Sequence, residues 1–196
     1  MKIPVTLLTG FLGSGKTTLL NALLRDPAMA GSAVLINEVG EIDIDHHLVE
    51  KLDEEIVLLQ SGCVCCSIRG DLSRSLRNLF MRRLRKELPA LDRVVIETTG
   101  LADPAPVIHT LINDFFVAER FCLDGVIVTV DVGHMHEHIE AYDEALKQIA
   151  MADRLIFTKC DLATEATIVA AEATAAALNP TAERLRAAGD TLSAVV

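Results

Sequence analysis

Residues 6–24 read TLLTGFLGSGKTTLLNALL. Within this stretch, GFLGSGKT (residues 10–17) fits the phosphate-loop pattern G-x-x-x-x-G-K-[ST] between an apolar, strand-like run and a helical pattern. The glycines let backbone N–H groups converge on phosphates without a Cβ in the way. We expect Lys16 to act on the β- and γ-phosphates and Thr17 to ligate Mg²⁺. The nucleotide-binding residues predicted from this segment are Gly10, Gly13, Ser14, Gly15, Lys16, Thr17 and Thr18.

Short β-branched runs and longer helical patterns alternate along the chain. This alternation predicts an α/β fold with a doubly wound, mostly parallel sheet flanked by helices. All 196 residues are expected to form one nucleotide-binding domain. Strands are predicted at 3–9, 33–37, 56–59, 93–97, 123–131 and 154–158, with one more within 184–196. Helices are predicted at about 16–24, 72–88, 138–152 and 164–178.

The composition excludes several classes of partner. The formal net charge of −10 argues against nucleic acid, because an acidic surface repels the phosphate backbone. The chain contains no apolar run of about 18 residues, which a membrane span would need. It opens directly on a strand-like run rather than on a signal peptide. The chain has five cysteines, three of them close together, and an odd, clustered set makes a poor disulfide framework. This pattern suits a reducing compartment, so we expect a cytoplasmic protein.

Two further segments are typical of a nucleotide pocket. Thr158-Lys159-Cys160-Asp161 follows an apolar strand, where a carboxylate at Asp161 would pair with guanine and the Lys159 stem would cover the base. GTPases usually carry Asn where this chain has Thr158. Glu97 ends another apolar strand, where we expect an Mg²⁺-side carboxylate, and Gly100 is expected to turn its N–H toward the γ-phosphate.

The cysteines at 63, 65 and 66 lie within four positions of each other. Three thiolates can hold one soft or borderline cation such as Zn²⁺, with a fourth ligand still open. Buried structural thiols or a redox dithiol are the alternatives. His134–His138 has metal-capable residues, but an exposed helix start explains it as well, and His46-His47 suits a surface. Cys122 and Cys160 are expected to be ordinary core and loop thiols.

Together these segments resemble the CobW-like family of P-loop GTPases, whose members include metallochaperones for zinc and cobalt and are connected with cobalamin biosynthesis. The resemblance implies GTP, Mg²⁺ and Zn²⁺ (or Co²⁺) as ligands, a client metalloprotein, slow GTP hydrolysis and, as one option, a homodimer. It makes Asn37–Asp45 a switch loop and Cys63, Cys65 and Cys66 the metal ligands. It also implies a second, C-terminal domain, which we expect to be absent here. The matching segments are TLLTGFLGSGKTTLLNALL, INEVGEIDIDHHLV, SGCVCC, VVIETTGLADPAPV and QIAMADRLIFTKCDL.

A coupling of the two sites follows as a hypothesis. The segment from Asn37 to Cys66 leaves the nucleotide pocket as a switch and ends at the thiolates, so GTP would favour one geometry of the metal site. Glu41, Asp45 and Glu97 are the candidates for activating water, with Lys16 assisting catalysis at the phosphates. A P-loop kinase for a small molecule or cofactor precursor and a thiol-based redox or zinc-sensing regulator remain the alternatives.

Overall fold

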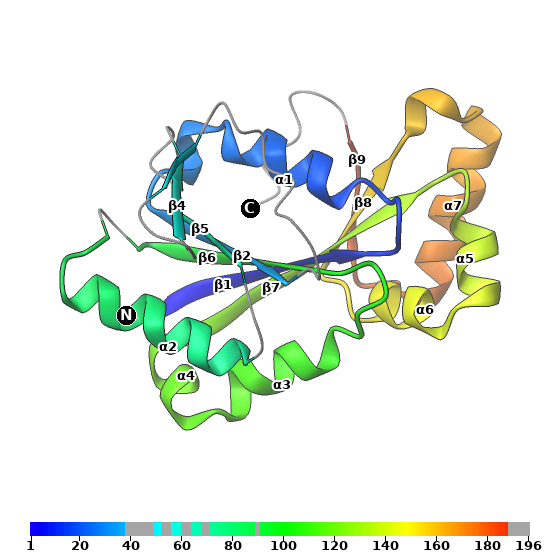
Figure 1. Ribbon diagram of the computed structural model, residues 1–196. Coiled ribbons are helices and arrows are strands. Elements are labelled where there is room, and N and C mark those ends of the chain that lie inside the picture. The colour runs from blue at the N-terminus through cyan, green and yellow to red at the C-terminus, as the bar shows by residue number, and fades with distance from the viewer. Residues whose placement is uncertain (38–48, 52–55, 60–63, 68–70, 89–90, 188–196) are drawn as a thin grey trace.

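The computed structural model describes residues 1–37, 49–51, 56–59, 64–67, 71–88 and 91–187, with side chains for 1–36, 71–88 and 91–187. Within these residues nine strands form one sheet, in the order β3-β4-β5-β2-β6-β1-β7-β8-β9 (Figure 1). The strands are β1 (Ile3–Gly10), β2 (Ser32–Asn37), β3 (Val49–Lys51), β4 (Ile56–Leu59), β5 (Val64–Ser67), β6 (Arg93–Thr98), β7 (Phe121–Asp131), β8 (Arg154–Thr158) and β9 (Glu183–Arg186).

Every pairing from β5 to β9 is parallel. The antiparallel pairings are those of β4 with β3 and with β5, at one edge, so that β4 alone among these strands runs against the others. This confirms the predicted doubly wound, mostly parallel fold. The helices that cover the sheet are α1 (Lys16–Leu24), α2 (Leu72–Leu84), α3 (Ala105–Asn113), α4 (Phe115–Arg120), α5 (Met135–Ala141), α6 (Asp143–Ala150) and α7 (Glu165–Leu178), with short 3₁₀ turns η1 (Pro27–Met29) and η3 (Cys160–Leu162).

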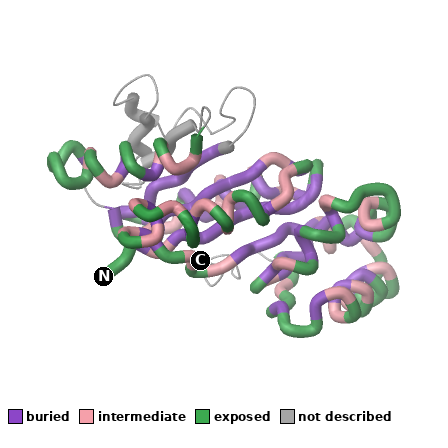
Figure 2. Tube along the Cα trace, turned by 90° about the horizontal axis from the view of Figure 1, so that it is seen from below, coloured by how far each residue is buried: buried purple, intermediate pink, exposed green. Residues whose placement is uncertain are grey.

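The central strands are buried on both faces, which explains their near-continuous apolar sequences. Successive side chains of β1 alternate between two cores: Val5 and Leu7 belong to the larger one and Leu8 to the smaller. The apolar side of α1 closes the smaller core, while residues of α2 to α7 contribute to the larger (Figure 1). Figure 2 shows the same pattern, with buried residues running along the central strands and exposed ones along the outer helices.

The helix predicted over 138–152 is wrong in its extent. The structure has two helices there, α5 and α6, which begin at Met135 and are separated by Tyr142 in an extended conformation (φ −140°, ψ 118°). The Tyr142 ring lies 4.8 Å, centroid to centroid, from the Phe11 ring of the phosphate loop. The break thus coincides with a tertiary contact to a residue more than a hundred positions earlier in the chain.

The other differences are smaller. The helix predicted to reach residue 88 ends at Leu84, which is 60% exposed, while Leu88 packs into the core from outside the helix. Sequence reasoning missed α3, α4, β3 and β5, none of which is longer than nine residues. Cys122, expected in the core, is exposed. No helix in the described part of the chain is long and apolar enough to cross a membrane.

Candidate nucleotide site

Four neighbouring parallel strands end at the same edge of the sheet. In the order β6, β1, β7, β8 they carry Glu97, Gly10, Asp131 and Thr158 at or near their carboxyl ends. Ligands of open α/β sheets bind outside this edge, where helix N-termini and loops converge. The strand order therefore gathers most of the predicted nucleotide-binding residues around one place.

The phosphate loop has the backbone that its glycines predict. Gly10, Gly13 and Gly15 adopt φ values of 142°, 70° and 90°, which L side chains rarely take. A Cβ at Gly10 would also overlap the side chain and carbonyl of Thr129 on β7. Lys16 is 6% exposed, and its Nζ donates hydrogen bonds to the carbonyls of Gly10 (2.9 Å) and Phe11 (3.3 Å).

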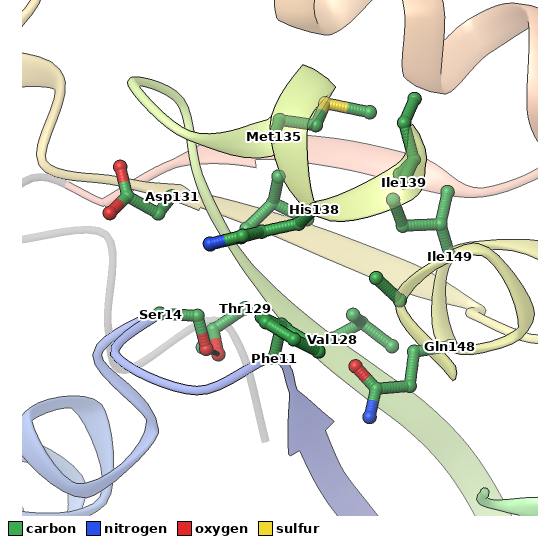
Figure 3. Close-up of a pocket in the computed structure, with 12 residues that line it drawn as sticks. Phe11, Ser14, Val128, Thr129, Asp131, Met135, His138, Ile139, Gln148 and Ile149 are labelled. Atoms are coloured by element: carbon green, nitrogen blue, oxygen red, sulfur yellow. Dashed lines mark hydrogen bonds between the residues drawn. The ribbon is translucent and has the colours of Figure 1, made fainter. Parts of the chain in front are cut away.

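Two hydroxyl groups tie this loop to the neighbouring strands. The Ser14 and Thr129 hydroxyl oxygens lie 2.7 Å apart (Figure 3). Thr158 Oγ1 donates to the carbonyl of Ser14 at 2.8 Å and also lies 3.2 Å from the carbonyl of Val130. The threonine that departs from the usual asparagine thus still links the end of β8 to the phosphate loop.

Thr17 and Glu97 meet beside the loop. Thr17 Oγ1 donates to Glu97 Oε1 at 3.2 Å, and the Glu97 side chain is only 1% exposed. A hydroxyl and a buried carboxylate within one hydrogen bond are hard oxygen donors, the kind that Mg²⁺ prefers. These residues therefore fit a magnesium ion.

Lys159 is held by a residue that the sequence analysis did not single out. Its Nζ lies 2.8 Å from Oδ2 of Asp131, an oxygen that is also 3.0 Å from His134 Nδ1. Asp131 is 4% exposed, and its other oxygen, Oδ1, accepts from the Gly133 N–H at 3.0 Å. Burial would raise the pKa of Asp131, but the hydrogen bonds from Lys159, His134 and Gly133 together hold it below the ordinary value. The signal for Asp131 was available: like Glu97, it is an acid that ends a buried strand.

The remaining predicted pocket residues lie around this centre. Asp161 is exposed within η3, and Thr18 is exposed in the first turn of α1. Gly100 is buried two residues beyond β6, so close to the loop that a Cβ there would lie 2.6 Å from Leu12 N.

Helix α5 packs an aromatic side chain against the loop. The His138 ring lies 4.5 Å from Phe11, centroid to centroid, and 5.9 Å from His134 in a stacked arrangement. Burial lowers the pKa of His138, with Asp131 opposing that shift. His134 and His138 thus share a helical face, as a metal pair would require. No group of three or more metal-capable side chains occurs among the described residues, however.

Several predictions fall on parts of the chain that the structure does not describe. Glu41, Asp45, His46, His47 and Cys63 lie outside the described residues. Cys65 and Cys66 lie in β5, whose backbone alone is described. Cys160 is half-buried, and burial raises the pKa of its thiol.

Known proteins resemble this chain in sequence and in fold. Residues 4–186 match the family model for the CobW/HypB/UreG nucleotide-binding domain. The zinc chaperone YjiA of Escherichia coli is 43% identical over 164 residues, which are 84% of this chain and 51% of YjiA. The zinc-regulated GTPase metalloprotein activator 1 of Schizosaccharomyces pombe is 36% identical over 173 residues, covering 85% of this chain and 41% of that protein.

The solved structures agree with the sequence match. The crystal structure of Zn(II)-bound YjiA GTPase from E. coli aligns with a TM-score of 0.76 and 39% identity, covering 94% of this chain and 57% of that one. This chain spans about half the length of the curated relatives it matches.

Proposed function

Because this chain belongs to the CobW/HypB/UreG family of nucleotide-binding domains, we propose that it binds and hydrolyses GTP and couples this to the handling of zinc. The observation that carries the nucleotide half is the contact between Thr17 and the buried Glu97 beside a complete phosphate loop. When bound, Mg²⁺ would be held by these two residues and would neutralise charge on the phosphates. Lys16, now on the loop carbonyls, would turn its ammonium group to the β- and γ-phosphates.

The guanine half of the proposal rests on Lys159 and Asp161. Asp161 is exposed and free to accept from the N1–H and N2 amino groups of guanine, a pair that adenine lacks. Lys159 adopts a left-handed backbone (φ 57°) and is tied to Asp131, which limits the positions of the stem that would cover the base. Asp161→Asn should therefore lower GTP affinity by 10²-fold or more and gain affinity for xanthosine triphosphate. Unchanged GTP affinity would argue against guanine recognition by Asp161.

The metal half of the proposal concerns Cys63, Cys65 and Cys66, with Zn²⁺ or Co²⁺ as cargo. The sheet register supports a link to the nucleotide. Ser67, directly after Cys66, is level with Ile36 of β2, and Ile36 is level with Glu97 of β6. Adjacent strands are about 4.8 Å apart, so the β5 backbone runs roughly 10 Å from the backbone that carries Glu97.

We therefore propose that GTP and metal binding are coupled through the segment from Asn37 to Cys66. Linkage requires metal to change GTP affinity by the same factor as GTP changes metal affinity. Glu97, Glu41 and Asp45 are the proposed residues for orienting water. Turnover should be slow, because no arginine finger can be assigned from the sequence. The same proposal includes transfer of the metal to a client metalloprotein in the cytoplasm. It also includes a homodimer that depends on nucleotide, and a role for this chain as one domain of a two-domain protein.

The experiment that tests the coupling is titration of the purified chain with Zn²⁺ and Co²⁺, with and without Mg²⁺ and a non-hydrolysable GTP analogue. The control is the variant with Cys63, Cys65 and Cys66 all changed to Ser. Cysteine-dependent binding that shifts with nucleotide would support a GTP-gated metal carrier. Binding that ignores the nucleotide would refute the coupling, and absence of binding would refute the metal site.

A further inference from the structure

Gln148 on α6 is a buried polar residue with no role in the site described above. Its side chain is 1% exposed, and its Nε2 donates hydrogen bonds to the carbonyls of Gly100 (3.1 Å) and Ala102 (2.9 Å). Both carbonyls belong to the loop that follows β6 and Glu97. The amide group uses both of its hydrogens on this loop, so α6 holds the loop at two points.

The other end of the same amide has no partner. Within the described part of the chain, Gln148 Oε1 is buried without a hydrogen bond. Exchanging the nitrogen and oxygen would set an oxygen against two carbonyl oxygens, so the orientation is fixed by the loop. Figure 3 shows this side chain beside Phe11, at the edge of a small cavity of about 20 Å³ also lined by Thr129 and His138. A buried acceptor without a hydrogen bond lowers the stability of the fold. The two hydrogen bonds from Gln148 to the loop, here called the clamp, are therefore retained despite this loss of stability.

The clamped loop also abuts the phosphate loop. A Cβ built on Gly100 would lie 2.6 Å from the backbone nitrogen of Leu12 and 2.7 Å from its Cα. Phe11, next to Leu12, is in turn in contact with the His138 and Tyr142 rings of the α5 segment. Gly100 therefore has the phosphate loop on one side, with no space for a side chain there, and its carbonyl is held by Gln148.

We propose that Gln148 is a positioning residue that sets the Gly100 loop for the γ-phosphate and so lets the protein distinguish GTP from GDP. This inference rests on the proposed GTPase function. By holding the Gly100 carbonyl, Gln148 fixes the orientation of the loop's peptide groups at the place where the third phosphate would arrive. A nucleotide that lacks the γ-phosphate does not reach this loop, so GDP binding should not depend on Gln148.

The test compares two variants of the chain, Gln148→Glu and Gln148→Leu. A carboxylate has no hydrogen to donate and is repelled by the two carbonyls, whereas leucine removes the clamp together with the unpaired oxygen. We expect affinity for Mg²⁺ and a non-hydrolysable GTP analogue to fall about tenfold in both variants, with GDP affinity changed less than twofold. Lys147→Gln is the matched control, because it removes only an exposed ion pair to Asp103 at 3.1 Å on the same loop, and it should stay within twofold.

The pH dependence separates positioning from damage to the fold. A buried glutamate facing two carbonyl oxygens has a raised pKa, and once protonated it can donate one hydrogen bond to the loop. The analogue affinity of Gln148→Glu should therefore recover partly between pH 7.5 and 5.5 relative to wild type, while that of Gln148→Leu should not. If the variants lose GDP affinity and analogue affinity equally, or lose neither, the proposal is overturned. A wild-type chain that binds neither nucleotide would instead overturn the GTPase proposal.

Discussion

Replacing Asp131 by asparagine should weaken guanine-nucleotide binding, although residue 131 itself is not proposed to contact the nucleotide. Asp131 is 4% exposed and is the partner of Lys159, at 2.8 Å, in the segment proposed to hold the base. Asparagine has the same shape, and its oxygen can still accept from the Gly133 N–H. Its amide nitrogen, however, would oppose the Lys159 ammonium, so the charged contact is lost and the lysine stem is released.

The size of the effect follows from the burial of the two partners. Hydrogen bonds to charged groups contribute about 1.5–3 kcal/mol, and the Lys159 side chain is 39% exposed, which places this one at the lower end. Because this contact affects binding only by holding the lysine stem in place, a loss of about 1.5 kcal/mol sets an upper limit of roughly a tenfold rise in the Kd for GDP and GTP alike. His134→Ala is the control: its side chain is 58% exposed and caps no helix, so binding should change less than twofold.

Fluorescent GDP and GTP analogues would give the Kd values, and urea unfolding would confirm that the variant is folded. The pH dependence of stability supplies a second readout. Burial raises the pKa of Asp131, but its hydrogen bonds outweigh this and lower it. Asp131 therefore stabilises the fold above its unfolded pKa of about 3.9, and this contribution disappears as pH falls through the lower folded value. Asp131→Asn should lack that part of the acid transition. Wild-type nucleotide affinity in a folded Asp131→Asn variant would refute the reasoning.

Three further predictions concern the loop and its contacts. Gly10→Ala should destabilise the fold by about 2–3 kcal/mol in urea unfolding and abolish nucleotide binding, because φ is 142° and the new Cβ overlaps Thr129; an unchanged unfolding midpoint would contradict this. Thr158→Val should lower the free energy of unfolding by about 1–2 kcal/mol and weaken nucleotide binding, because the carbonyl of Ser14 in the phosphate loop loses its hydrogen-bond donor. Thr158→Ser keeps the hydroxyl group and should retain wild-type stability and nucleotide affinity. Burial lowers the pKa of His138, so the wild-type unfolding free energy should decrease as pH falls below about 6.5, and His138→Phe should remove this dependence while keeping the contact with Phe11.

Sequence reasoning succeeded where the signal is local. The glycines of the phosphate loop need their backbone angles whatever surrounds them, and the buried central strands carry their apolar runs in sequence. It failed where a distant residue decides. The only local signal of the break at Tyr142 is the pair of acids in the first turn of α6, Asp143 and Glu144. The ring contact of Tyr142 with Phe11, more than a hundred positions away, cannot be seen in the sequence. Gln148 likewise reads as an ordinary residue of an amphipathic helix until the loop carbonyls that it binds are placed beside it.

Asp131 lies between these two cases. Its position at the end of a buried strand is visible in the sequence, but the role of the residue can be inferred only once the order of the strands in the sheet is known. Glu97 and Asp131 each end a buried strand in an acid, and the same pattern suggests the same role for both. The order β6-β1-β7-β8 separates them. Glu97 lies on one side of β1, against Thr17 of the helix that starts from the phosphate loop, while Asp131 lies on the other side, next to β8 and Lys159. Under the proposed function, the two strands that flank β1 would set the phosphate side and the base side of the pocket, and the two acids would serve different ends of one nucleotide.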